Sequence, residues 1–389
     1  MAQLLSVIGD QFARVALTVL VYARTESASL TALTYALTLL PSIVSGPLLS
    51  GLADRYPRRQ VMVLADVTRA GLVVIMAVPT MPLPWLCGLL VLVQFLAAPF
   101  TAARAATLPE VLNGDQYRLA VSLSNMTYQA ALLIGFASGG VLVAGVSPSG
   151  ALLLDAATFL GSAALVRWRV QDRPLPAGAT PGSQAGASWA HTLSAGARLV
   201  STDPQLRMWV WLLCMCAFPV VVEGLAVPYA VTIDAGPAGV GLLLAAPPAG
   251  SLLGMLLLNR LPPTVRLHAL WPLAVVSSAV LVFCAAGPGL VPTIMLWTVS
   301  GAATSYVVVA NGEYVRAVPA HQRGQAVGLA STAMRVAQGA AVLTAGLIAD
   351  TANPPAVVAI AGGAGVLITA CGWVLARRSA AVRTPADRH

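Results

Sequence analysis

The sequence predicts an all-α integral membrane protein with twelve transmembrane helices in two pseudo-symmetric six-helix bundles. Of the 389 residues, 58% are hydrophobic and only 9% are charged, whereas a soluble domain carries about 25% charged residues. No Asp, Glu, Lys, Arg or His occurs in residues 70–103, 269–312 or 351–376, and apolar runs of about 18 residues or more are typical of membrane-spanning helices. This composition excludes soluble enzyme folds and nucleic-acid-binding domains.

Twelve apolar segments are long enough to be transmembrane helices, and none shows the alternating pattern of a membrane β-barrel. In chain order they are 4–23, 30–50, 60–79, 84–104, 119–145, 149–167, 206–229, 236–258, 269–286, 290–310, 325–349 and 354–376. The first segment carries Asp10, Gln11 and Arg14 in its middle and has no basic residue before it. It is therefore expected to be a transmembrane helix rather than a signal peptide.

The distribution of arginine orients these helices. The 22 Lys and Arg residues are all arginines. With the N-terminus in the cytoplasm, 18 of them fall in cytoplasmic loops, at cytoplasmic helix ends or in the tail, and Arg24 alone falls outside. Short cytoplasmic loops retain basic residues, so this split predicts that both termini are cytoplasmic. The net charge of +8 then reflects membrane topology rather than affinity for nucleic acid.

Residue types that bind cofactors or metals are missing or scattered. Without lysine there is no Walker-type phosphate loop, so ATP hydrolysis by this chain is not expected. The cysteines fall inside apolar runs and are Cys87, Cys214, Cys216, Cys284 and Cys371. We expect neither a disulfide nor a metal site from them. No catalytic constellation is visible, so we expect no enzyme activity and no cofactor.

The longest polar stretch, 168–205, divides the chain. Its prolines and glycines are typical of a linker, and residues 188–201 within it are expected to form a short interfacial helix. The predicted parts are an N-terminal bundle at 1–167, a cytoplasmic linker at 168–205, a C-terminal bundle at 206–376 and a cytoplasmic tail at 377–389. Residues 120–123 match residues 326–329 at an offset of 206, which indicates an internal duplication of the kind found in transporters.

The loop after the second helix reads Ser50-Gly51-Leu52-Ala53-Asp54-Arg55-Tyr56-Pro57-Arg58-Arg59. It resembles the signature loop of the major facilitator superfamily, roughly G-x-L-x-D-R-x-G-R-R, with Ser50 and Pro57 in place of the two glycines. The resemblance extends over the whole chain, and residues 9–11 and 104–110 further resemble the twelve-helix bacterial branch that exports drugs, siderophores and macrolides. It implies a monomeric transporter of the bacterial cytoplasmic membrane, with a small-molecule substrate, protons and the lipid bilayer as partners.

The same loop carries a predicted conformational latch. Asp54 ends the second helix, where its carboxylate can cap the N-terminus of a neighbouring helix. The resemblance implies that this neighbour begins near residues 324–325, and that the contact forms only when the cytoplasmic side is closed. Asp54, Arg55, Arg58 and Arg59 would then bias one state of alternating access. In the alternative reading, the arginines only anchor the loop in the cytoplasm.

Small residues indicate close helix packing. The stretch Gly135-Phe136-Ala137-Ser138-Gly139-Gly140 resembles the G-P-x-x-G-G pattern of proton antiporters, except that Phe136 replaces the proline. The resemblance implies that the helix 119–145 faces the helix 236–258 across the two bundles. GxxxG spacing lets helices approach closely, and the packing candidates are Gly135, Gly139, Gly140, Gly250 and Gly254.

Charges inside the membrane are functional candidates, because each costs about 2.5–3.5 kcal/mol on insertion scales. Asp10 and Arg14 are four residues apart, and Asp66 and Arg69 are three apart, so each pair can meet on one helix face. Glu223 has no charged neighbour on its own helix. Since the transmembrane segments lack histidine, the proton-coupling candidates are carboxylates: Asp10, Glu223, Asp66 and Asp155. The alternatives are structural ion pairs, a hydrogen bond for Asp155 and a water-exposed site for Glu223.

Polar and aromatic residues near the middle of helices are predicted to line a substrate cavity, where large aromatics suit amphipathic ligands. The candidates are Arg14, Tyr35, Gln94, Tyr128, Gln129, Phe218, Trp297, Tyr306 and Arg335. Arg335 would face either an acid on another helix or an anionic substrate. The helix 84–104 carries Gln94 but not the mid-helix arginine that related drug–proton antiporters often have.

The sequence therefore predicts a secondary active transporter that exports small amphipathic molecules by proton antiport. One alternative is an uptake permease or uniporter of the same fold, favoured by the missing arginine and proline. Another is a non-transporting receptor or assembly protein, which would not need Asp10 or Glu223 to be ionisable.

Overall fold

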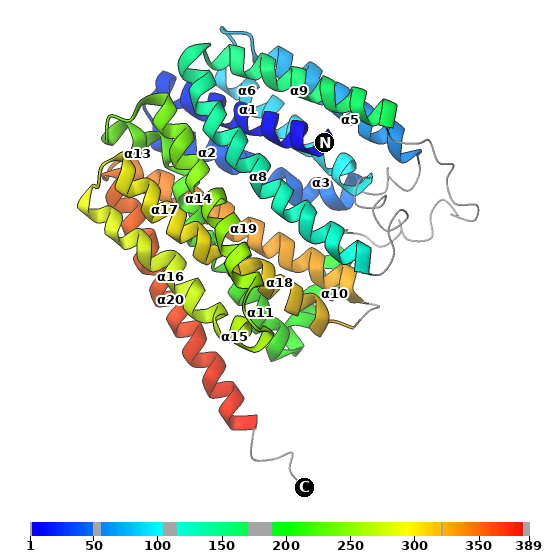
Figure 1. The fold of residues 1–389 in the computed structure, drawn as a ribbon, viewed down its shortest axis with the longest axis vertical. Coiled ribbons are helices and arrows are strands. Elements are labelled where there is room, and N and C mark those ends of the chain that lie inside the picture. The colour runs from blue at the N-terminus through cyan, green and yellow to red at the C-terminus, as the bar shows by residue number, and fades with distance from the viewer. Residues whose placement is uncertain (1, 50–55, 104–114, 170–188, 320–321, 384–389) are drawn as a thin grey trace.

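The computed structural model describes residues 2–49, 56–103, 115–169, 189–319 and 322–383, and within these ranges the chain is helical with no strand (Figure 1). The N-terminal helices are α1 (Ala2–Thr25), α2 (Ala28–Leu39), α3 (Pro41–Leu49), α5 (Arg58–Met76), α6 (Leu83–Phe95), α8 (Asp115–Gly145) and α9 (Pro148–Arg169). The helix α10 (Trp189–Thr202) lies where a short interfacial helix is predicted. The C-terminal helices are α11 (Pro204–Cys214), α12 (Ala217–Gly224), α13 (Ala226–Thr232), α14 (Gly236–Asn259), α15 (Pro263–His268), α16 (Leu270–Ala279), the 3-10 helix η1 (Val280–Ala286), α17 (Leu290–Thr304), α18 (Tyr306–Ala317), α19 (Arg323–Ala349) and α20 (Pro354–Arg383). The predicted all-α fold is confirmed.

Ten helical stretches in the described part of the chain are long and apolar enough to cross a membrane. Two predicted spans are not among them. The predicted helix 60–79 is α5, which carries the charged residues Arg58, Arg59, Asp66 and Arg69. The predicted helix 269–286 is α16 followed by η1, a shorter apolar segment. The exact count of twelve spans therefore stays a prediction.

Prolines divide two of the predicted spans. The predicted helix 206–229 consists of α11, α12 and α13, and Pro219 and Pro228 each follow a break between them. Pro41 likewise begins α3 directly after α2 ends. Proline has no N–H to donate and its ring clashes with the carbonyl four residues earlier, so a helix bends or ends there. One result is that Glu223 lies on the short helix α12.

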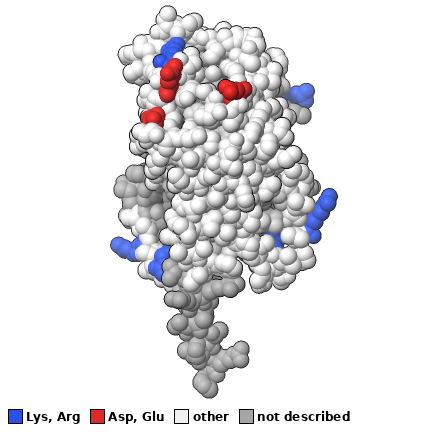
Figure 2. Space-filling model, turned by 90° about the vertical axis from the view of Figure 1, so that its left-hand side faces the viewer, with Lys and Arg blue, Asp and Glu red and all other residues white. Residues whose placement is uncertain are grey.

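The two ends of the bundle differ in charge. The arginine-rich end, where α5 begins and α9 and α18 end, carries Arg58, Arg167 and Arg316. The opposite, arginine-poor end, where α1 ends and α2 begins, carries Arg24. Figure 2 shows a face with a broad uncharged surface between charged groups near its top and bottom. Large apolar side chains are exposed, such as Phe283 at 68%, and such a surface fits the hydrocarbon core of a bilayer.

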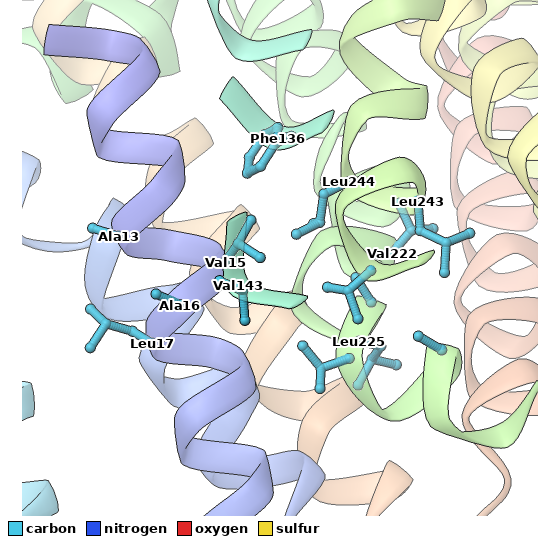
Figure 3. Packing of buried hydrophobic residues seen from close by; sticks show 14 of the residues in the cluster. Ala13, Val15, Ala16, Leu17, Phe136, Val143, Val222, Leu225, Leu243 and Leu244 are labelled. Atoms are coloured by element: carbon cyan, nitrogen blue, oxygen red, sulfur yellow. The ribbon is translucent and has the colours of Figure 1, made fainter. Parts of the chain in front are cut away.

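The N-terminal helices meet the C-terminal helices along two lines. On the first, α8 packs on α14, and a Cβ on Gly140 would lie 2.6 Å from the Gly241 Cα. On the second, α2 packs on α19, where Gly346 faces Ala32. In Figure 3, apolar side chains of these and neighbouring helices share one buried cluster, including Val15, Phe136, Val143, Leu225, Leu243 and Leu244. Glycine lets the backbones approach closely at both lines.

The predicted packing glycines all lie at helix contacts, but mostly within one group of helices. Gly135 and Gly139 face α1, while Gly250 and Gly254 face the backbone of α17. Gly140 faces α14 across the two groups. The contact between α8 and α14 that the resemblance implied is present, but Gly140 makes it rather than the two GxxxG pairs. Spacing along a helix indicates a small-residue face without saying which neighbour covers it.

Candidate functional site

The described residues enclose a central hollow with two lobes. We call the first the charged lobe, with a volume of about 760 Å³, and the second the apolar lobe, with a volume of about 800 Å³. Tyr128, Leu132, Val220, Glu223 and Gln338 line both lobes, so the lobes adjoin. Because these residues belong to α8, α12 and α19, the hollow lies between the N-terminal and C-terminal helices.

The charged lobe is lined by Asp10, Arg14, Arg69, Glu223 and Arg335, among others. The Tyr35 hydroxyl donates a hydrogen bond to Oε2 of Glu223, which joins α2 to α12. Arg14 and Arg335 form no ion pair within the described part of the chain. The Arg14 Nε–H is buried and has no hydrogen-bond acceptor among the described residues. Both arginines act electrostatically on Glu223.

The apolar lobe has a different lining. Its apolar wall includes Leu213, Val222, Pro247, Pro248 and Met255. Among the described lining residues, Glu223 alone carries a charge, and Gln129, Ser251 and Asn311 supply polar groups. Ligand sites of this kind combine an apolar wall with a few polar groups that fix orientation. The lobe can therefore hold the apolar body of a small molecule.

Six of the predicted cavity residues line the hollow: Arg14, Tyr35, Gln94, Tyr128, Gln129 and Arg335. The other three lie elsewhere. Trp297 is fully buried with its ring edge-on to Tyr229 at 5.4 Å, and Tyr306 is fully buried and donates to the Leu212 carbonyl at 3.2 Å. Phe218 packs against a second apolar cluster. The position of a residue in the sequence predicts how deep it lies along a helix. Which neighbour its side chain faces depends on how the helices pack, and aromatic rings are often buried where helices meet.

Within the described part of the chain, the hollow extends to the arginine-rich end. The apolar lobe reaches Asn259, the last residue of α14, and Asn311 on α18. At the arginine-poor end, no described lining residue lies in the terminal turn of a helix. The structure is therefore closed at the arginine-poor end.

Asp350 connects the two groups of helices at the closed end. It follows α19 and accepts hydrogen bonds from the backbone N–H of Ser29 at 3.0 Å and from the Ser27 hydroxyl at 3.2 Å, both at the start of α2. Burial alone would raise the pKa of Asp350, but hydrogen bonds from Ser29, Ala28 and Ser27 outweigh it and hold the pKa below the ordinary value of 3.8. The ionised carboxylate thus caps α2 and favours closure of this end.

Three carboxylates and one guanidinium meet where α1, α5 and α9 pack together, and we call Asp10, Asp66, Arg69 and Asp155 the buried acid cluster. Arg69 lies 2.7 Å from Asp10 and 3.7 Å from Asp66. Asp155 interacts electrostatically with Asp10 and Arg69. Asp66 and Asp155 are fully buried, whereas the Asp10 side chain is 19% exposed and lines the charged lobe. Asp10 therefore connects the cluster to the hollow.

The surroundings hold Arg69 but leave carboxylate oxygens without a hydrogen bond. The Phe159 ring centroid lies 4.1 Å from the guanidinium carbon of Arg69, a cation–π contact. Both carboxylate oxygens of Asp66 and Oδ2 of Asp155 have no hydrogen-bond partner among the described residues. A Cβ on Gly9 would overlap Oδ1 of Asp155, so glycine at this position lets α1 approach α9. The described residues include no group of three or more His, Cys, Asp or Glu arranged to hold a metal ion.

One predicted ion pair is replaced by another. The spacing along α1 predicts an Asp10–Arg14 pair, but Asp10 pairs with Arg69 of α5 instead. Asp10 faces α5 and α9, and Arg14, one turn further along α1, faces the hollow without pairing to Asp10. The predicted Asp66–Arg69 pair is present. Asp10 is only four residues from Arg14 in the sequence, yet it pairs with Arg69. Helix packing sets the rotation of α1 against its neighbours, and the spacing along the helix does not.

The predicted latch falls partly outside the described residues. Asp54 and Arg55 lie outside them, and Arg58 and Arg59 form the first turn of α5 at the arginine-rich end. The expected partner, the start of α19, lies at the same end, where the carbonyl of Gln325 is 2.8 Å from the position of a Cβ on Gly196 of α10. The latch therefore stays a proposal.

Sequence reasoning missed two residues of the site. Gln338 lines both lobes and donates a hydrogen bond to the Cys216 sulfur at 3.3 Å. It follows Arg335 by three residues on a helix, a spacing that places both on one face, and this signal could have identified it. Asp350 could have been suspected as a cap because it directly follows a predicted span.

Comparisons with known proteins agree on one family. The family model described as Major Facilitator Superfamily matches residues 1–312. The uncharacterized MFS-type transporter YfiS of Bacillus subtilis (strain 168) is 32% identical over 142 residues, which cover 36% of this chain and 34% of that protein. The match thus spans about a third of that relative's length.

Solved structures share the fold at low identity. The nucleoside transporter NupG is similar with a TM-score of 0.72 and 14% identity, over 96% of this chain and 99% of that one. A POT family transporter in complex with a thioalcohol-conjugated peptide gives a TM-score of 0.77 at 12% identity, over 97% and 95%. An inward-facing bacterial homologue of the human lysosomal transporter Spinster gives 0.67 at 14% identity, over 96% and 93%.

Proposed function

This chain belongs to the Major Facilitator Superfamily, and we propose that it is a multi-pass secondary active transporter that exports small amphipathic molecules from a bacterial cytoplasm in exchange for protons. The observation that carries this proposal is the central hollow, which lies between two groups of helices, extends to one end of the described helices and is closed at the other. A substrate site that alternates its access needs these features.

The direction of opening supports an inward-facing state. Basic residues are retained on the cytoplasmic side of a membrane, so the arginine-rich end is the cytoplasmic end in this proposal and both termini are cytoplasmic. Residues 1–167 and 206–376 would move as two bundles joined by the linker 168–205. Closing the cytoplasmic end would bring Asp54, Arg55, Arg58 and Arg59 to the start of α19, as the latch predicts.

The buried acid cluster is the proposed proton carrier. Three carboxylates surround the single guanidinium of Arg69, so full ionisation would leave two uncompensated negative charges in the protein interior. Burying an unpaired charge is costly, and a proton on the cluster removes part of that cost. Asp10 lines the hollow and would pass the proton between the hollow and Asp66 and Asp155.

Glu223 has a different place in this proposal. It lines both lobes and accepts a hydrogen bond from Tyr35, so its charge acts directly on whatever occupies the hollow. Among the proton-coupling candidates predicted from the sequence, it is the one that lines both lobes.

An uptake permease or uniporter is the second candidate. It is favoured by Gln94 in the charged lobe, where an arginine is often found in drug–proton antiporters, and by Phe136 in place of a proline in α8. Neither residue belongs to the acid cluster.

The test is a compound panel in an efflux-deficient bacterial host that expresses the full chain, with and without a protonophore. Protonophore-sensitive resistance to, or exclusion of, at least one compound is expected, and Asp10→Asn should abolish it at equal expression. Asp234→Asn, a substitution in an exposed loop at the arginine-poor end, is the matched control. Uptake of the same compounds into cells without any efflux phenotype would contradict export and favour the permease.

A further inference from the structure

The charges of the charged lobe do not balance. Asp10 is paired with Arg69 at 2.7 Å. The charged lining that remains among the described residues is Arg14, Arg335 and Glu223. Two guanidiniums therefore face one carboxylate, and that carboxylate already accepts a hydrogen bond from Tyr35. The lobe keeps a net positive charge even when Glu223 is ionised.

The two arginines also have unused hydrogen-bonding capacity. Neither forms an ion pair within the described residues, and the Arg14 Nε–H is buried without an acceptor. An arginine in a membrane interior is costly unless a partner compensates for it. Its planar guanidinium offers several N–H donors in a geometry that matches a carboxylate.

We propose that the transported molecule carries a carboxylate, which binds between Arg14 and Arg335 while its apolar body occupies the apolar lobe. This proposal rests on the proposed transport function for the identity of the site. It deepens that function by naming the chemical class of the substrate as an amphipathic carboxylate rather than a cation.

The position of the two arginines gives the anion a further effect. Arg14 lies on α1 and Arg335 on α19, so one carboxylate would contact both groups of helices. A ligand shifts a conformational equilibrium only by the difference in its affinity for the two states. A carboxylate held from both sides binds best when the two groups close around it, and it therefore favours closure of the cytoplasmic end.

Glu223 opposes the substrate in this arrangement. Its carboxylate competes for the electrostatic attraction of the same two arginines. Replacing it by glutamine removes that competition while a side chain of similar size can still accept the Tyr35 hydrogen bond. Glu223→Gln should therefore bind a carboxylate more tightly than the natural chain does.

The test measures binding to the purified full chain in lipid nanodiscs. The probes share one ring and differ in one group: naphthylacetate carries a carboxylate, naphthylethanol a hydroxyl and naphthylethylamine an ammonium. Calorimetric titration should give a Kd for naphthylacetate about tenfold lower than for naphthylethanol, as expected when charge-assisted hydrogen bonds are added. Empty nanodiscs correct for partitioning of the probes into lipid.

Variants assign the preference to the two arginines. Arg14→Gln and Arg335→Gln should each remove the tenfold preference, and the conservative Arg14→Lys and Arg335→Lys should retain part of it, which separates loss of binding from loss of folding. Arg316→Gln is the matched control, since Arg316 is 79% exposed and pairs with Glu313. Its Kd values should equal those of the natural chain.

The proposal is overturned by three outcomes: no binding of naphthylacetate, equal or tighter binding of the other two probes, or an unchanged preference in both glutamine variants. Binding is measured without a proton gradient, so it is independent of export. A transporter whose efflux is insensitive to protonophore but which still prefers the carboxylate would contradict the proposed antiport and leave this inference standing.

Discussion

The acidic side chains inside this protein are held in two different ways. Asp10, Asp66 and Asp155 lie around Arg69 at the edge of the charged lobe, and Asp66 and Asp155 are fully buried. Glu223 lies in the hollow itself, bonded to Tyr35 and within reach of the charge of two arginines. The three aspartates have fewer positive charges near them than are needed to balance their own, whereas Glu223 has more.

The role of a carboxylate inside a membrane therefore depends more on the charged groups around it than on its depth in the bilayer. A site with excess negative charge attracts protons, and a site with excess positive charge attracts anions. On this basis the acid cluster is the proposed proton site, and Glu223 with Arg14 and Arg335 is the proposed substrate site.

The largest expected effect comes from removing the guanidinium of the cluster. Arg69→Gln leaves three carboxylates without their cation, and breaking a buried ion pair on one side costs about 3–5 kcal/mol. We expect little folded protein, measured as the monodisperse fraction and the thermal unfolding temperature in detergent. Adding Asp10→Asn and Asp66→Asn to Arg69→Gln should recover part of the loss. Recovery in neither measurement would contradict charge imbalance as the cause.

The next effect concerns the approach of α1 to α9 beside the cluster. In Gly9→Ala the new Cβ would overlap Oγ1 of Thr158 and Oδ1 of Asp155, and overpacking of this kind costs about 1–3 kcal/mol. The unfolding temperature should fall. Gly161→Ala is the matched control on α9, because its Cβ would meet only Leu5 at 3.8 Å, an ordinary contact. Equal unfolding temperatures for the two variants would show that the helices are not in close contact at Gly9.

The smallest effect is expected at the closed end. Asp350→Asn weakens the cap on α2, and because Asp350 is exposed we expect a shift of only about twofold to fivefold toward opening, corresponding to about 0.5–1 kcal/mol. Hydrogen exchange at the start of α2 and the end of α19 should become faster by that factor. Asp234→Asn should leave the exchange rates unchanged, and equal rates in both variants would remove Asp350 from gating.

The same contact sets a pH dependence. The pKa of Asp350 is lowered by the contact, so the contact favours the ionised form. Its contribution to closure is fully present above the ordinary value of 3.8 and is lost as the pH falls through the lowered pKa. The protection factor at the closed end, which corrects the exchange rate for the intrinsic pH dependence of amide exchange, should therefore be independent of pH near neutrality and fall only in strong acid. A loss of protection near pH 6 or 7 would indicate that another group controls this end.

Much of the fold followed from the sequence because a membrane imposes simple rules. Long apolar runs predicted the helices, and the positions of the arginines predicted where the helices end. Both features depend on contact with lipid or water along one axis. The cavity lining was predicted less well. Trp297 and Tyr35 lie at similar depth on their helices, but one is packed against Tyr229 and the other faces the hollow.

The acid cluster could not have been assembled from sequence. Its members come from three helices, and Asp10 pairs with Arg69 rather than with Arg14, which lies one turn away on the same helix. Such pairings depend on helix rotation, which is fixed by contacts such as the one that Gly9 permits. The sequence identified Asp10, Asp66 and Asp155 as separate candidates without showing that they lie together.

Infrared spectroscopy of the purified chain in nanodiscs can show whether the buried acid cluster holds a proton, through the band of protonated carboxyl groups at neutral pH. If the cluster holds a proton because three carboxylates share one guanidinium, the double variant Asp10→Asn with Asp155→Asn should lose band intensity, since the remaining Asp66–Arg69 pair is neutral. Glu223→Gln should keep the intensity that belongs to the cluster. A double variant with the same band as the natural chain would contradict the assignment of the proton to the cluster.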